Sequence, residues 1–98
     1  LNTLQEESDP QKTSVTATAL GLLLLDQTGN HADAAVILLD AALLWHTATG
    51  GWDAGDLWNL KRARASIGQG ALDQLITARV PPDLQTSLAS GIESAQNP

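Results

Sequence analysis

The sequence predicts an all-α fold, a small antiparallel helical array of about four to five helices in one domain. Apolar residues make up 43% of the chain and charged residues only 16%, a balance that favours folding over disorder. Leu and Ala, both strong helix formers, dominate the apolar set, whereas Phe, Tyr and Met are absent. We expect a flexible lead-in over residues 1–12 and a single helical domain over residues 13–95.

The first predicted helix covers about residues 13–28. Its first half alternates polar and apolar residues, and its second half contains four consecutive leucines, which predicts burial nearly all round. Gly21 costs a helix about 1 kcal/mol relative to Ala, so we expect its missing side chain to admit a close neighbour at a helix crossing. The helix should end at Thr28, with Gly29 in a left-handed conformation and Asn30 capping the next helix.

The second predicted helix runs from about His31 to Ala48 and is apolar around most of its circumference. Its polar positions recur every seven residues along one narrow stripe, at Asp33, Asp40 and Thr47. Such a helix belongs in the centre of a bundle or against a partner. Because a small domain has few other helices to cover it, we expect surplus apolar surface that includes Ile37 and Leu44, covered by a homodimer or by a partner helix.

Three shorter helices are predicted after the Gly50-Gly51 break. Asp53 is placed to cap a helix that starts near Ala54, with Asp56 at the third position of its first turn. Gly68 and Gly70 then separate this helix from a short fourth one, which Pro81 and Pro82 end, and Pro82 can occupy the first turn of a fifth helix.

The net charge of −6 argues against a nucleic-acid partner, because it repels phosphate backbones. Three of the five cations, Lys61, Arg62 and Arg64, fall towards the end of the third helix, where the helix dipole favours positive charge. We therefore expect them to be solvated and structural. The charge-free stretches are shorter than the ~20 residues that cross a bilayer, so no membrane-spanning segment is expected.

No residue pattern predicts catalysis, a cofactor or a metal site. His31 and His46 are fifteen residues apart, too far for the i, i+4 pair of helical zinc sites, and we interpret them as a cap-region and a partly buried histidine. Asp53 and Asp56 suit helix capping better than general acid–base chemistry. Since the chain has no cysteine, the redox compartment stays open.

The three tryptophans, Trp45, Trp52 and Trp58, bracket the Gly50-Gly51 turn. They are either the bulkiest core residues of a chain without Phe or Tyr, or interface residues, since tryptophan is enriched at binding hot spots. Trp52, in the turn itself, is the best candidate for exposure. The candidate partner-binding residues are Trp45, Trp52, Trp58, Ile37 and Leu44.

Residues 20–43 resemble a tetratricopeptide repeat, a helical hairpin with small residues at its packing points. The resemblance is carried by Leu20-Gly21, by Gly29-Asn30-His31-Ala32-Asp33-Ala34 and by Ala41-Ala42-Leu43. The spacing from Gly21 to Gly29 is one residue longer than usual, and His31 stands where an aromatic residue is common. The resemblance implies binding of a protein in a helical groove or a scaffold role.

Two functions follow as hypotheses. The first is a noncatalytic protein–protein interaction or scaffold domain, an accessory of secretion or assembly, whose partner is another protein or a second copy of the chain. The alternative is a helical domain that binds a small apolar ligand or lipid in a cavity of roughly 300 Å³ or more.

Overall fold

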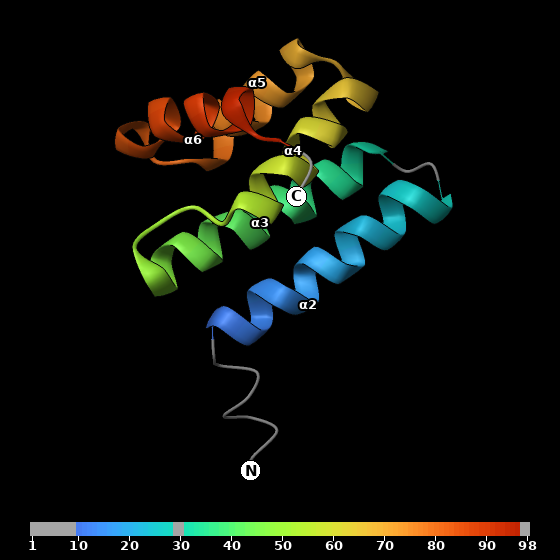
Figure 1. Cartoon of the computed structure of the whole chain (residues 1–98). Coiled ribbons are helices and arrows are strands. Elements are labelled where there is room, and N and C mark those ends of the chain that lie inside the picture. The colour runs from blue at the N-terminus through green and yellow to red at the C-terminus, as the bar shows by residue number, and fades with distance from the viewer. Residues whose placement is uncertain (1–9, 29–30, 97–98) are drawn as a thin grey trace.

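The computed structural model describes residues 10–28 and 31–96, and this part of the chain is helical throughout apart from short connections, with no strand. Five α-helices are present in it, the first continued by a π-helical segment (Figure 1). This confirms the predicted all-α class. In chain order the elements are α2 (Pro10–Leu23), η1 (Leu24–Thr28), α3 (His31–Thr49), α4 (Ala54–Ile67), α5 (Gln69–Arg79) and α6 (Pro82–Ser94).

Helices α2 and α3 form an antiparallel hairpin (Figure 1), and α2 approaches α3 closely at Gly21. A Cβ atom on Gly21 would lie 2.7 Å from Cγ of Leu38, so only glycine fits there without a shift. Seven residues before Gly21 on α2, the hydroxyl of the buried Ser14 donates a 2.7 Å hydrogen bond to the carbonyl of Ala41 on α3. The close crossing predicted from Gly21 is confirmed.

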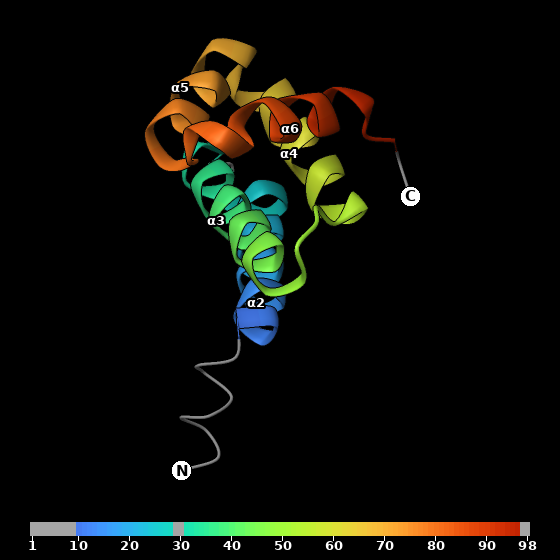
Figure 2. The same ribbon diagram turned by 90° about the vertical axis from the view of Figure 1, so that its left-hand side faces the viewer.

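Helix α3 is the central helix of the fold. Helix α2 packs on one side of it, and α5 and α6 lie on the opposite side, with α4 crossing between (Figures 1 and 2). By length and mean hydropathy of 1.2 it resembles a membrane-crossing helix, but its buried residues make the core of the bundle, consistent with the prediction that the chain does not span a membrane. Those buried residues are Ala34, Ala35, Leu38, Leu39, Ala41 and Ala42.

The ends of α4 follow the capping chemistry expected from the sequence. Asp53 has an extended backbone and its Oδ2 accepts a 3.1 Å hydrogen bond from the backbone N–H of Asp56. Gly68 ends the helix at φ 96°, a conformation that side chains rarely adopt. Pro82 occupies the first turn of α6. The predicted starts of these helices are thus confirmed to within about a residue.

The first helix differs from its prediction in two respects. It begins at Pro10, inside the expected lead-in. Its second half is not buried all round, because Leu20 is 49% exposed and Leu23, in the leucine run, is 54% exposed. The physical reason is position: α2 lies at the edge of the bundle and packs mainly against α3 (Figure 1). The expected turn at Gly29 and Asn30 lies outside the described residues.

The basic residues of α4 connect neighbouring elements. Lys61 Nζ donates to the carbonyls of Glu93 at 3.1 Å and Ala95 at 3.0 Å, at the end of α6. Arg64 forms a 2.8 Å ion pair with Glu93, and Arg62 forms a 2.7 Å ion pair with Asp26 of η1. These contacts support the structural role that the helix dipole suggested.

Candidate functional site

The outer face of α2 carries the exposed large hydrophobic side chains of the described residues: Val15 is 60%, Leu20 49% and Leu23 54% exposed. Thr16 and Ala19 are exposed between them. We call these five residues the outer face of α2. At about 100° per residue they fall within an arc of about 140°, from Val15 to Leu20, on the side of the helix away from Gly21. Exposed apolar side chains gathered on one element mark interaction surfaces.

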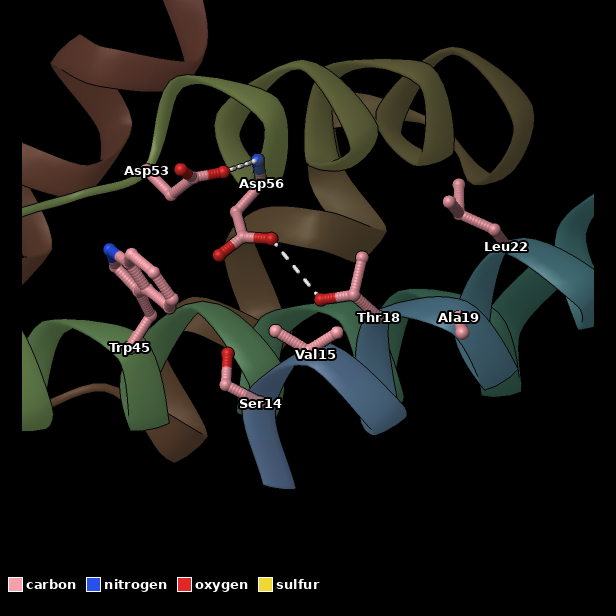
Figure 3. A pocket seen from close by; sticks show the side chains of 8 residues that line it. All are labelled: Ser14, Val15, Thr18, Ala19, Leu22, Trp45, Asp53 and Asp56. Carbon is pink, nitrogen blue, oxygen red and sulfur yellow. Dashed lines mark hydrogen bonds between the residues drawn. The ribbon is translucent and has the colours of Figure 1, made fainter. Parts of the chain in front are cut away.

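A cleft of about 380 Å³ runs along α2 beside this face (Figure 3). Its walls are α2, Trp45 of α3 and the start of α4. The eight residues around it are Ser14, Val15, Thr18, Ala19, Leu22, Trp45, Asp53 and Asp56. A second hollow of about 460 Å³ continues it past Lys12 and Thr16, and Val15 and Trp45 line both. We call the two hollows together the α2 cleft; it joins the outer face of α2 at Val15.

Asp56, one of the acidic residues that line the cleft, is buried. Its side chain points towards α2, where the Thr18 hydroxyl donates a 3.2 Å hydrogen bond to Oδ1 (Figure 3). The pKa of Asp56 is raised from 3.8 to about 6, chiefly by burial and also by the nearby charge of Asp53, while the hydrogen bond from Thr18 opposes the rise. The carboxyl group therefore changes its charge between mildly acidic and neutral pH.

These groups do not assemble a catalytic or metal-binding constellation in the described part of the chain. Asp53 accepts from the backbone of α4, and Asp56 accepts from Thr18. Neither His31 nor His46 lines the α2 cleft. Within residues 10–28 and 31–96, no group of three His, Cys, Asp or Glu side chains is placed to hold a metal ion.

The three tryptophans are all half-buried and serve different contacts. Trp45 lines the α2 cleft. Trp52 packs against the ring of His46, with centroids 4.3 Å apart, and its Nε1 donates a 3.1 Å hydrogen bond to Ser87 Oγ of α6. It is therefore less exposed than its turn position suggested, because His46 and α6 cover it. Trp58 lies on α4 and is not among the residues that line the cleft.

Exposed apolar side chains were expected on the second predicted helix, α3, but the large ones lie on the first, α2. Ile37 and Leu44 of α3 are half-buried, and Leu44 borders a shallow hollow with Leu43. The polar stripe of α3 does face outward, and Asp40 on it pairs with both Nε and Nη2 of Arg79 at 3.0 and 2.7 Å. Neighbouring helices cover α3 on two sides, so its large apolar side chains are buried or half-buried. The exposed large apolar side chains therefore lie on the edge helix, α2.

Sequence reasoning did not single out Ser14, Val15, Leu23 or the buried position of Asp56. The alternation of residues 13–18 and the leucine run were visible, but they did not show which side of the helix meets α3. Comparisons with protein-family models, with curated proteins and with solved structures find no match for the chain. The candidate site is therefore inferred from the structure of this chain alone.

Proposed function

We propose that the protein is a noncatalytic protein-interaction domain that docks a partner on the outer face of α2 and the adjoining cleft. The observation that carries the proposal is the concentration of Val15, Leu20 and Leu23 on one edge helix, each about half exposed or more. Fully burying such a side chain contributes roughly 1.5–3 kcal/mol, so covering the exposed parts of these three side chains would favour the binding of a partner.

The α2 cleft adds a place for one side chain of the partner. Its apolar walls and the Trp45 ring suit an aliphatic or aromatic anchor of the kind that dominates interface energies. The tetratricopeptide-like span 20–43 falls on the α2–η1–α3 hairpin, and its small residue Gly21 packs against Leu38. Both features support a scaffold or accessory role, in secretion or in assembly of a larger complex.

The proposal is tested by affinity capture followed by reconstitution from purified components. The variant Leu23→Gln removes an exposed apolar group of the outer face, while Thr77→Ala on α5 alters an exposed residue elsewhere. We expect a captured protein to bind the purified chain and the Thr77→Ala variant equally, and to bind Leu23→Gln at least about tenfold more weakly, about 1.4 kcal/mol. Equal binding of all three forms would contradict docking on α2.

The alternative function, binding of a small apolar ligand, is favoured by the volume and apolar walls of the α2 cleft. Titration with decanoic acid, followed by the indole fluorescence and by the amide signals of residues 14–22, tests it. Saturable binding that is lost on replacing Ala19 with Gln would establish a ligand site. No change in these signals would exclude this class of ligand.

A further inference from the structure

We infer that the partner on the outer face of α2 is a second copy of the chain, with the two α2 helices packed antiparallel about a twofold axis at Ala19. The inference rests on the proposed function and names its partner. It is drawn from a symmetry in the order of residues along α2 and η1. Lys12 and Asp26 each lie seven residues from Ala19, on opposite sides, and Val15 and Leu23 each lie four residues from it.

In an antiparallel pair centred on Ala19, residues equally distant from the centre face each other. Val15 of one chain then meets Leu23 of the other, and the two Ala19 side chains meet on the axis. An alanine at the centre allows the helix axes to approach within the usual 8–10 Å. A twofold arrangement uses the same surface on both copies, so it closes as a dimer, with Ala19, Val15 and Leu23 in the contact and Leu20 at its margin.

Charge selects the antiparallel direction. Lys12 and Asp26 are the charged residues of segment 10–28, and they have opposite signs. The antiparallel pair brings each Lys12 to the partner's Asp26, whereas a parallel pair would bring like charges together. Asp26 accepts from Arg62 through Oδ1 and its side chain stays 49% exposed, so Oδ2 can accept from a lysine of the second copy. Exposed ion pairs add little affinity but fix orientation.

The size of the surface sets the expected affinity. Helix α2, with 14 residues, is about 21 Å long at 1.5 Å per residue, so one helix pair buries less than the roughly 1,600 Å² of a standard interface. The dimer is therefore expected to be reversible, with a Kd on the order of 10 to 100 µM. The two hairpins would stack as one four-helix layer in the order α3, α2, α2 and α3.

Sedimentation equilibrium of the full chain measures this association. Leu20 and Leu23 are matched in type and exposure, but Leu23 lies about 40° and Leu20 about 100° around the helix from Ala19. We expect Leu23→Gln to weaken dimerisation at least about tenfold, about 1.4 kcal/mol, and Leu20→Gln to change it less than about threefold. A wild-type chain that stays monomeric up to ~1 mM, or equal effects of the two variants, would overturn the inference.

Cysteine cross-linking tests the direction of packing, because the natural chain has no cysteine. Disulfides form between Cα atoms up to about 7 Å apart, so a mixture of the variants Val15→Cys and Leu23→Cys should yield chiefly the mixed disulfide. Predominant Val15→Cys homodimers would contradict antiparallel packing.

A monomeric chain that still binds a purified partner through Leu23 would end the self-association inference and leave the proposed function standing.

Discussion

Gly21 of α2 lies directly against Leu38 of α3, with room for a hydrogen but not for a methyl group: a Cβ there would be 2.7 Å from Leu38 Cγ. This contact fixes the rotation of α2 about its own axis. With Gly21 facing α3, Leu23 faces outward, about 160° around the helix from Gly21, whereas Val15 lies about 120° from Gly21 and borders the α2 cleft. One missing side chain thus determines which residues are available to a partner.

Replacing Gly21 with Ala should destabilise the fold. The added methyl group must displace the buried Leu38, and overpacking of this kind costs about 1–3 kcal/mol, offset by about 1 kcal/mol from the better helix propensity of Ala. We expect a net loss of about 1 kcal/mol or more in the free energy of unfolding, measured by urea denaturation.

Gly70→Ala is the matched control, because Gly70 also lies within a helix, α5, but a methyl group added there would have nothing within 4 Å. It should gain up to about 1 kcal/mol from helix propensity alone. If both alanines stabilise the protein equally, the close crossing of α2 and α3 is not present in solution.

Asp56→Asn should stabilise the protein at neutral pH. The folded pKa of Asp56, about 6, lies above its unfolded value of 3.8, so the folded state holds the proton more tightly. Its contribution to stability is complete below pH 3.8 and is lost as the pH rises through 6. At pH 7 that loss is at most on the order of 3 kcal/mol, and asparagine avoids it while retaining an oxygen for Thr18.

The measurement is the melting temperature of both proteins between pH 4 and pH 8. The difference between Asp56→Asn and wild type should grow as the pH rises across this range, whereas Asp73→Asn, an exposed change on α5, should track wild type. A difference that is constant with pH would mean that the carboxyl group titrates as an ordinary exposed aspartate.

Replacing Lys61, Arg62 and Arg64 together with Gln should preserve the fold but lower its melting temperature. Three contacts disappear, to the end of α6, to Asp26 and to Glu93, while the apolar core is unchanged. Circular dichroism checks helix content and melting. Nanomolar binding of duplex DNA at physiological salt by wild type, abolished in the triple variant, would instead show that these residues form a nucleic-acid site.

The helices could be predicted from local chemistry, and the exposed site could not. Asp53, Gly68 and Pro82 act on the adjacent backbone, so their roles are visible in the sequence. The exposure of Leu23 depends instead on which helix lies at the edge of the bundle. Likewise, Asp56 looks like an ordinary first-turn acid in the sequence, but in the fold it is buried and accepts a hydrogen bond from Thr18, thirty-eight residues earlier.

The most direct test of the account is a dilution series of amide spectra of the uniformly labelled chain, from ~1 mM to ~10 µM, a range that spans the Kd expected for an interface of this size. We predict concentration-dependent shifts at Lys12, Val15, Ala19, Leu23 and Asp26, together with the indole of Trp45. The signals of α5 and α6 should stay fixed. Shifts centred on α5 and α6, or spectra that do not change with concentration, would contradict self-association through the outer face of α2.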